Sequence, residues 1–392
     1  MQDWNVNVAG VNFKNPIIAA AGGPTINVDA MARCIEAGMG AVTTKSISFI
    51  PFTWKMPRPA NFFLDTYGDP GSMTTIELGF WKPADGEEFV RQIRPVANRA
   101  NARVIANINL EGYEAGPLAD LVKKLQDAGA DMIETACPCP IVTPIETAGK
   151  WYEENLETVT RILGATAKVP FYTKCPTDFL TPQNIRIIED SGAAAIHFTP
   201  PPYGITVDIE TGRPLLPAYG LYYNKGWRGV GSYFTYLLST MTKLPVVCSG
   251  GVATGRDAIE RLMLGASLVG ICTIIMYRGY EAAAQMVKEF SRFMDDKEYR
   301  TVDDIIGIAS PHVGDLNQFT DIIVQGQVPK EAAATILDPK KCTGCGKCTV
   351  CTYGAVTITD KKCFIDQGLC EKCGVCVSIC PKKAISIERY QS

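Results

Sequence analysis

Absences in the sequence narrow the classes of protein to which the chain can belong. The 392 residues carry a formal net charge of only −3, so their charge gives no reason to expect a nucleic acid or an anionic membrane as a partner. No segment approaches the roughly 18 uninterrupted apolar residues of a membrane span. The first ten residues, MQDWNVNVAG, lack the basic start and the apolar run of a signal peptide. We therefore expect a cytoplasmic protein without a membrane or nucleic-acid partner.

Two further features are scarce. No G-x-G-x-x-G motif follows the first apolar run, which disfavours a Rossmann nucleotide site. Histidine occurs only twice, as His197 and His312. We expect both histidines to be structural, although His197 lies near the end of an apolar run and could face a substrate.

Cysteine, by contrast, is abundant and unevenly distributed. Nine of the fifteen cysteines lie in about the last fifty residues, in and around the runs CTGCGKCTVC, from Cys342, and CEKCGVCVSICP, from Cys370. Two C-x2-C-x2-C runs, each followed by a further cysteine, are typical of a ferredoxin module with two 4Fe–4S clusters. A structural zinc site would need only four ligands, and a disulfide framework would imply an oxidising compartment. Clusters that carry single electrons explain the spacing best.

In such modules the fourth ligand of each cluster comes from the other run. One predicted set of ligands is Cys342, Cys345, Cys348 and Cys380. The other predicted set is Cys370, Cys373, Cys376 and Cys351. The first run is one residue shorter than C-x3-C-P before its last cysteine and lacks the proline, so Cys363 is the alternative to Cys351 as the eighth ligand.

The first three hundred or so residues alternate short apolar runs with amphipathic segments, which is the pattern of a parallel sheet covered by helices. Eight runs end at Ala20, Lys45, Asn109, Ala136, Lys174, Thr199, Ser249 and Cys272. Glycines before four of these runs predict helix C-caps, at Gly38, Gly129, Gly192 and Gly265. The count of runs predicts a (β/α)8 TIM barrel, with a doubly wound open sheet as the alternative.

We therefore predict an α/β chain with a barrel over residues 1–313, a linker over 314–337 and a small α+β bacterial-ferredoxin-like domain over 338–392. Long segments follow several predicted strands, at about 46–75, at 137–151 and after Thr199. In a barrel, such loops lie on the C-terminal face, where the active site is found.

Residues that could bind a cofactor or transfer a proton cluster at these strand ends. Lys45 and Lys174 each end a run, and a buried lysine needs a partner such as an anionic or electron-rich cofactor. Glycines after the seventh and eighth runs predict a phosphate site of backbone N–H groups with a helix N-terminus behind them. Cys137, in the motif ACPCP, could exchange a proton with a carbon acid. The alternatives are that Cys137 and Cys139 are packed cysteines or metal ligands.

The motifs NFKNPIIAAAG, AVTTKS, ACP, FYTK, GVGS and CSGGV together resemble the FMN barrel of dihydroorotate dehydrogenases. With the ferredoxin module after the barrel, the chain is similar to the FMN and iron–sulfur portion of dihydropyrimidine dehydrogenases, particularly the bacterial subunit form. The resemblance implies an oxidoreductase that adds or removes two hydrogens across a C=C bond adjacent to a carbonyl. An electron-transfer subunit whose flavin only relays electrons is the rival function.

The resemblance also assigns site residues. Cys137 would be the general acid or base, and Lys174 would lie near N1 and O2 of the flavin. The residues that would line the isoalloxazine ring are Ala20, Ala21, Lys45 and Ser46. The residues that would hold the FMN phosphate are Gly231, Ser232, Gly250, Gly251, Cys272 and Thr273.

Departures from the family motifs concern the substrate. Three asparagines that read the pyrimidine in the family correspond here to Glu134, Thr75 and the region of Thr199, which we take as candidate substrate-binding residues. Without those asparagine amides, the protein lacks the groups that would hydrogen-bond to a pyrimidine ring. A non-pyrimidine substrate is therefore the alternative. Because the chain has no nicotinamide-binding signature, the expected electron partner is a ferredoxin or an NAD(P)-linked flavoprotein subunit. The resemblance also implies a homodimer or a larger complex.

Overall fold

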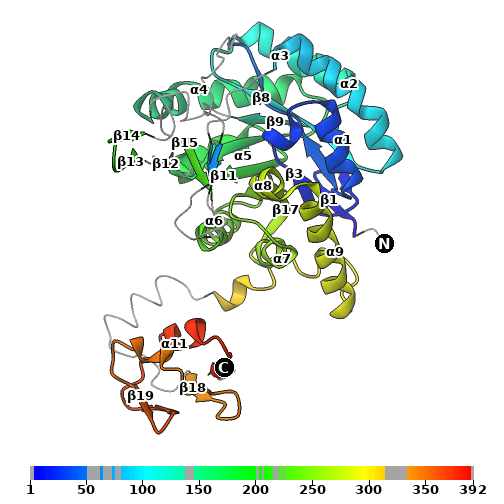
Figure 1. Ribbon diagram of the computed structural model, residues 1–392. Coiled ribbons are helices and arrows are strands. Elements are labelled where there is room, and N and C mark those ends of the chain that lie inside the picture. The colour runs from blue at the N-terminus through cyan, green and yellow to red at the C-terminus, as the bar shows by residue number, and fades with distance from the viewer. Residues whose placement is uncertain are drawn as a thin grey trace. The chain divides into compact units, whose positions relative to one another are not determined.

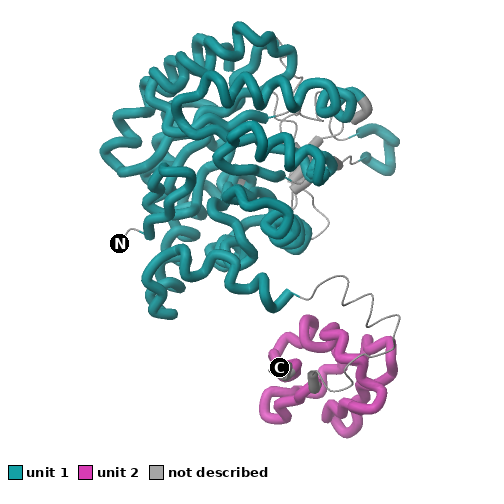
Figure 2. Tube along the Cα trace, turned by 180° about the vertical axis from the view of Figure 1, so that it is seen from behind, with its two compact units in different colours: residues 1–313 teal, residues 314–392 magenta. Residues whose placement is uncertain are grey.

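The computed structural model describes residues 4–50, 62–64, 73–75, 81–136, 145–199, 203–204, 207–214, 220–223, 226–313 and 333–389. The chain divides into two compact units, Met1–Val313 and Gly314–Ser392 (Figure 2). Each unit has its own apolar core, and the core of the second unit contains cysteines.

Eight parallel strands close into a barrel in the first unit (Figure 1). They are β3 (Ile17–Ala19), β4 (Ala41–Thr43), β8 (Arg103–Asn109), β9 (Met132–Ala136), β10 (Phe171–Pro176), β11 (Ala195–Thr199), β16 (Val246–Ser249) and β17 (Ala266–Ile271). The barrel closes because β17 pairs with β3, β3 with β4, and β4 with β8. The predicted (β/α)8 barrel is confirmed. The alternative of an open sheet is wrong, since each of these eight strands pairs on both sides.

Helices cover the outside of the barrel (Figure 1). They are α1 (Val28–Glu36), α2 (Pro83–Arg99), α3 (Ala115–Asp127), α4 (Ile145–Thr166), α5 (Pro182–Asp190), α6 (Trp227–Met241), α7 (Gly255–Met263), α8 (Thr273–Arg278) and α9 (Tyr280–Asp296). The four glycines that the sequence predicted as C-caps all have positive φ angles, between 79° and 108°. Glycine adopts this conformation without the steric cost that a side chain brings, so these helices end where the next strand must begin.

Short strands complete the first unit. The hairpin of β1 (Val6–Val8) and β2 (Val11–Phe13) precedes the barrel, and β5 (Ile47–Ser48) extends the pairing along β8. A separate sheet contains β6 (Phe62–Leu64), β7 (Met73–Thr75), β15 (Gly220–Tyr223) and β12 (Tyr203–Gly204), and β13 (Val207–Asp208) pairs with β14 (Arg213–Pro214). Because these segments follow β4 and β11, they belong to the loops that leave the C-terminal ends of the barrel strands.

The interior of the barrel is polar at some positions. Six of the seven residues of β8 are buried, as expected for a strand that faces helices on one side and the barrel interior on the other. Two of the buried residues are Asn107 and Asn109, which lie two apart and therefore on the same face. A buried amide requires hydrogen-bond partners, and these partners lead to the candidate site.

The second unit contains two pairs of antiparallel strands. β18 (Ala333–Leu337) pairs with β21 (Ile385–Arg389), and β19 (Val356–Thr359) pairs with β20 (Lys362–Ile365). The helical segments η4 (Lys347–Val350) and α11 (Val375–Ile379) complete this predicted α+β unit. The predicted linker over 314–337 is wrong at its C-terminal end, because 333–337 form a strand of this unit; 314–332 lie outside the described residues. Among the described helices, none is both long and apolar enough to cross a membrane.

Candidate active site

A chain of buried polar side chains crosses the interior of the barrel. Glu134 of β9 accepts a hydrogen bond from the side-chain amide of Asn107 of β8, and its Oε2 lies 2.6 Å from Nδ1 of His197 of β11. Nε2 of His197 lies 3.1 Å from Oγ of Ser249 of β16. Glu134 and His197 are each only 1% exposed. Four strands of the barrel thus share one hydrogen-bonded network.

The two ionisable groups of this network hold different protonation states. Burial by itself would raise the pKa of the Glu134 carboxyl, but His197 and Lys174 stabilise the charged form and lower the pKa to about 2. Burial lowers the pKa of His197, although the charge of Glu134 opposes this effect. At neutral pH the carboxylate is therefore charged and the imidazole neutral. Nδ1–H of His197 donates to Glu134, and Nε2 accepts from the hydroxyl of Ser249.

Two lysines lie at the same end of the barrel. Lys174 of β10 is partly exposed and lies opposite His197 in the strand register. Lys45, two residues beyond β4, is 6% exposed. The positive charge of Lys174 is one of the groups that stabilise the Glu134 carboxylate. The charged residues Glu134, Lys174 and Lys45 therefore lie on strands or strand ends of this part of the barrel. The two lysines would favour an anionic or electron-rich ligand there.

Small residues lie at the neighbouring strand ends. Ala20 follows β3, and its N–H donates to the carbonyl oxygen of Ile271 of β17 at 2.9 Å. A Cβ built on Gly270 would lie 3.2 Å from Cβ of Ala20, so the two strands approach closely because both residues are small. Ala21 and Ser46 are partly exposed beyond their strands. The parallel strands bring Ala20, Ala21, Lys45, Ser46 and Lys174 to one end of the barrel.

A tight glycine turn follows β16. Gly250 and Gly251 have φ angles of 92° and 74°, and a Cβ on Gly251 would lie 2.5 Å from the carbonyl carbon of Trp227 at the start of α6. Within the described part of the chain, the N–H groups of Gly251 and of Thr273, the first residue of α8, donate to no acceptor. Free backbone N–H groups at adjacent strand ends are suited to an anion.

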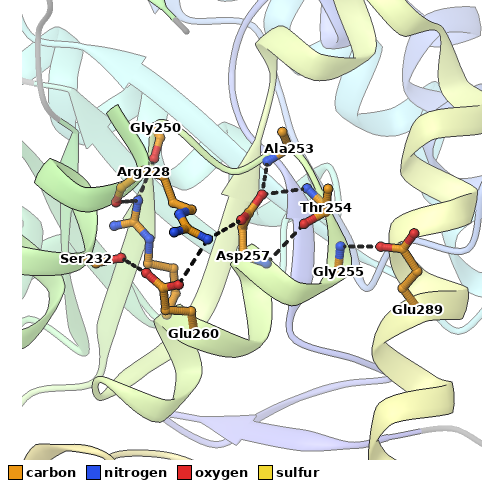
Figure 3. Close-up of polar contacts among 10 residues, drawn as sticks. Arg228, Ser232, Gly250, Ala253, Thr254, Gly255, Asp257, Glu260 and Glu289 are labelled. Carbon is orange, nitrogen blue, oxygen red and sulfur yellow. Dashed lines mark hydrogen bonds and ion pairs between the residues drawn. The ribbon is translucent and has the colours of Figure 1, made fainter. Parts of the chain in front are cut away.

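The N-terminus of α7, however, is already satisfied by carboxylates (Figure 3). Oδ2 of Asp257 accepts from the N–H groups of Ala253 and Thr254 at 3.0 and 2.9 Å. Glu289, from α9, accepts from the N–H of Gly255 at 2.8 Å. The expectation that the helix behind the glycines offers its N-terminus to a phosphate is therefore wrong for α7, since two negative side chains occupy that end.

Gly231 and Ser232 lie in the second turn of α6, where the helix engages their N–H groups. Oγ of Ser232 donates to Oε1 of Glu260 at 2.5 Å. A Cβ on Gly231 would lie 2.2 Å from Nη2 of Arg261, a fully buried side chain that donates to the carbonyl oxygen of Gly250 at 2.9 Å. These two residues thus hold the glycine turn against α6 and do not present a phosphate cradle themselves.

Several predicted residues lie in or beside the loops of this face. Cys137 and Cys139 are outside the described residues. β9 ends at Ala136, so Cys137 directly follows the strand that carries Glu134. Thr75 ends β7, and Thr199 is partly exposed at the end of β11.

Sequence reasoning missed Asn107 and Ser249. Their signal was available, because a polar residue inside an otherwise apolar, fully buried strand must find a hydrogen-bond partner. The sequence did not indicate which strand would supply that partner.

In the second unit, the first predicted set of cluster ligands lines one cavity. Its wall contains Cys342, Cys345, Cys348 and Cys380, and Cys363 in addition. Three of these thiols come from the first run and one from the second, as the crossed arrangement requires. No three acidic, histidine or cysteine side chains of the described residues form a site for a single metal ion; these thiols surround a cavity instead.

The two cysteine runs fold as similar halves. Gly346 before η4 and Gly374 before α11 have φ angles of 77° and 80°. Cys351 and Cys380 follow these helices with (φ, ψ) of (−58°, 112°) and (−71°, 110°). η4 is one residue shorter than α11, which accounts for the shorter spacing before Cys351. Cys351 is thus the structural counterpart of Cys380, and this favours Cys351 over Cys363 as the eighth ligand.

Family comparison agrees with both units. Residues 4–294 match the family model for dihydroorotate dehydrogenase, and residues 364–386 match the model for a 4Fe-4S binding domain. The first match covers about three quarters of the chain. The chain belongs to the dihydroorotate dehydrogenase family. It is a flavin-dependent oxidoreductase with a 4Fe–4S ferredoxin motif, as the resemblance predicted.

Relatives within the dihydroorotate dehydrogenase family are distant but extend over the whole barrel. The catalytic subunit of dihydroorotate dehydrogenase B (NAD(+)) from Methanocaldococcus jannaschii is 29% identical over 314 residues, which are 77% of this chain and 97% of that protein. The corresponding subunit from Thermoplasma acidophilum is 26% identical and covers 79% of this chain and 99% of its own length. The chloroplastic dihydropyrimidine dehydrogenase (NADP(+)) of Arabidopsis thaliana is 25% identical, over 78% of this chain and 76% of its own.

The residues of this dihydroorotate dehydrogenase barrel fit FMN. The small residues Ala20 and Ala21 lie at the same end of the barrel as Lys45 and Lys174, which supply positive charge. The N–H groups of Gly251 and Thr273, which have no acceptor among the described residues, can receive a phosphate. The sequence suggested Glu134 as a substrate-binding residue. Both of its carboxylate oxygens are instead hydrogen-bonded inside the barrel, to Asn107 and His197.

Proposed function

We propose that the chain is an FMN- and iron–sulfur-dependent oxidoreductase that adds or removes two hydrogens across a C=C bond adjacent to a carbonyl of a small molecule. The observation that carries this proposal is the combination, in one chain, of a dihydroorotate dehydrogenase barrel with a 4Fe-4S binding domain. Relatives named dihydroorotate dehydrogenase and dihydropyrimidine dehydrogenase support the reaction class.

FMN, when bound, would supply hydride exchange at one carbon of the C=C bond. Cys137 would exchange the proton at the other carbon, from its place directly after β9. Lys174 and Lys45 would offset negative charge at the ring. The residues that we propose to hold the phosphate are Gly250, Gly251, Cys272 and Thr273, through backbone N–H groups.

The barrel network would prepare this end of the barrel for the cofactor. The Glu134 carboxylate fixes the tautomer and the ring orientation of His197, whose other nitrogen accepts from Ser249. The positive charge of Lys174 is in turn one of the groups that stabilise the Glu134 carboxylate. These residues act by position and charge, without a proton transfer of their own.

Electrons would pass between the flavin and a partner protein through two 4Fe–4S clusters. The first cluster would be held by Cys342, Cys345, Cys348 and Cys380. The second would be held by Cys370, Cys373, Cys376 and Cys351. The partner would be a ferredoxin or an NAD(P)-linked flavoprotein subunit, and the relatives' designation as catalytic subunits supports an assembly with another chain. The chain would form a homodimer or part of a larger complex, as the family resemblance implies. NADH or NADPH alone should not reduce the isolated chain rapidly, and fast reduction would contradict a separate partner.

The leading substrate class is a dihydropyrimidine, because the named relatives act on such rings. One observation favours a second candidate, a non-pyrimidine enone or its saturated form. At the position where the resemblance places a pyrimidine-reading amide, Glu134 is buried and both oxygens are engaged by Asn107 and His197. Because Glu134 is only 1% exposed, a polar ring cannot reach this side chain unless the network opens, at the cost of leaving buried donors without acceptors.

An anaerobic titration decides among these substrates. The FMN-loaded protein is mixed with dihydrouracil, dihydrothymine or dihydroorotate while the flavin absorption band is followed, and dithionite is the positive control. Bleaching by one of the three compounds would establish the corresponding pyrimidine activity. No bleaching in a protein that dithionite still reduces would favour a non-pyrimidine substrate, and a purified protein that binds no FMN would contradict the proposed function.

A further inference from the structure

A fifth cysteine lines the cavity formed by the first set of predicted cluster ligands. This residue is Cys363 of β20. Its Sγ lies 3.8 Å from Sγ of Cys348, within the reach of a hydrogen bond between sulfur atoms, and its side chain is only 4% exposed. The contact between a surplus thiol and a ligand thiol requires a physical explanation.

The strand register fixes the position of Cys363. It lies opposite Ile358 of β19 in the antiparallel hairpin and packs in the small core of the unit with Val356 and other apolar side chains. Its neighbours Lys362 and Phe364 are exposed. Because side chains alternate along a strand, the hairpin directs Cys363 inward and holds it against the cavity.

Cys363 is not needed as a ligand. The first set is complete with its four cysteines, and the matching backbone angles of Cys351 and Cys380 assign Cys351 to the second set. A buried cysteine that binds no metal behaves as a small apolar residue with a weak S–H donor. Cys363 therefore brings one proton-bearing sulfur into contact with the first cluster's shell of ligands.

We propose that Cys363 donates an S–H···S hydrogen bond to the thiolate of Cys348 and thereby raises the reduction potential of the first cluster. A cysteine that binds iron is deprotonated, so Cys348 can only accept and Cys363 must be the donor. When the partner protein delivers one electron to the cluster, negative charge on the ligand sulfurs increases. A donor to one of these sulfurs stabilises the reduced cluster more than the oxidised one. Cys363 thus acts on the cluster through Cys348. This proposal rests on the two-cluster module proposed above.

The test uses the full-length protein with its FMN and clusters bound. Cys363→Val keeps a similar side-chain volume without a donor, Cys363→Ser keeps a donor, and Cys345→Ser removes a predicted ligand as the control for cluster loss. Iron content is measured first. An EPR-monitored redox titration, without substrate, then gives the reduction potential of each cluster.

We expect Cys363→Val to bind as much iron as the wild type and to show a lower potential for one cluster only. The equilibrium constant for its reduction should fall at least about threefold, the size expected for the loss of one hydrogen bond. Cys363→Ser should retain most of the wild-type potential, and Cys345→Ser should lose iron.

Three results would overturn the proposal. Loss of iron in Cys363→Val would make Cys363 a ligand. A wild-type potential in Cys363→Val, or equal potentials in the valine and serine variants, would show that the thiol proton has no effect on the cluster. Wild-type protein with only about four iron atoms would contradict the two-cluster module itself, and this failure is recognised before any variant is compared.

Discussion

Nδ1 of His197 lies 2.6 Å from Oε2 of Glu134 in the interior of the barrel, where neither side chain is more than 1% exposed. Removing such groups from water is costly unless every donor and acceptor finds a partner. Asn107 and Ser249 provide the remaining partners, and Lys174 provides an opposite charge. Glu134 and His197 are therefore both hydrogen-bonded within the protein, while Oδ1 of Asn107 has no partner among the described residues. The network ties four strands together at the end of the barrel that would hold the flavin.

Replacing Glu134 by glutamine should destabilise the barrel. The carboxylate accepts from two donors, Asn107 and the Nδ1–H of His197, whereas glutamine has one acceptor oxygen and turns an N–H donor toward the second partner. We expect the free energy of unfolding to fall by about 2 kcal/mol. Urea denaturation followed by tryptophan fluorescence measures this change in the barrel, because all five tryptophans lie within residues 1–313.

A matched control for Glu134→Gln is Glu157→Gln. Glu157 lies on α4 in an exposed ion pair with Arg161, and its side chain is 72% exposed. Its replacement should change the free energy of unfolding by no more than about 0.5 kcal/mol. Equal effects of the two substitutions would contradict a stabilising hydrogen-bond network around Glu134.

The stability of the barrel should rise with pH in the acidic range. The folded pKa of Glu134 lies at about 2, below its ordinary value of 4.5, and that of His197 lies below 6.5. The unfolded chain therefore binds more protons than the folded chain. On acidification, stability is lost first below pH 6.5 as the unfolded histidine protonates, and then from pH 4.5 toward about 2 through the carboxyl group.

The contribution of His197 can be separated from the other groups. Urea midpoints of the wild type and of His197→Asn should be compared between about pH 8 and pH 5, with His312→Asn as the control for removal of the exposed histidine. The dependence on pH below 6.5 should be weaker in His197→Asn than in the wild type. The same slope in both proteins would mean that folding does not lower the pKa of His197.

The strand ends could be predicted from the sequence because apolar runs mark them locally. Asn109, Ala136, Thr199 and Ser249 are each the last residue of a strand, as predicted. The cysteine runs could be interpreted for the same reason, since ligand spacing is a local property. The (β/α)8 architecture followed from the number of these local units.

The partners of Glu134 could not be predicted in the same way. Asn107 and His197 lie 27 and 63 residues away in the sequence, and only the closure and register of the barrel bring them together. Gly231 and Ser232 were assigned to a phosphate loop from a short motif. They lie in α6 because the buried positions Gly231, Thr235 and Leu238 follow helical spacing. The absence of a side chain at Gly231 leaves space for the buried Arg261.

Replacing Gly251 by alanine should weaken FMN binding. The φ angle of 74° is strained for a residue with a side chain, and the new Cβ would lie 2.5 Å from the carbonyl carbon of Trp227. The turn must then move away from α6, which displaces the free N–H group of Gly251. We expect the dissociation constant for FMN to rise at least about tenfold, as roughly 1–2 kcal/mol of strain implies. Reconstitution of apoprotein, followed by flavin fluorescence, measures it.

Gly229→Ala is the matched control for this substitution. Gly229 lies on α6, the helix that the Gly251 turn packs against, and a Cβ on Gly229 would meet no atom within 4 Å. Alanine should leave FMN affinity unchanged and slightly stabilise α6. If Gly251→Ala folds with wild-type tryptophan fluorescence and binds FMN as tightly as Gly229→Ala, the glycine turn does not hold the phosphate.

Replacing Cys137 by serine separates an enzyme from an electron relay. A serine hydroxyl is a far weaker acid than a thiol, so it cannot exchange a proton with the substrate carbon at a useful rate. We expect turnover with the substrate found by flavin bleaching to fall about 10²–10⁴-fold, while dithionite still reduces the flavin and the clusters at the wild-type rate. Cys139→Ser, two residues away in the sequence, is the control and should retain most of the activity. Full substrate turnover in Cys137→Ser would contradict the assignment of Cys137 as the acid or base. A wild type that passes electrons to an acceptor but turns over no substrate, with the same rate in Cys137→Ser, would favour a flavin that only relays electrons, because a relay requires no proton donor at the flavin face.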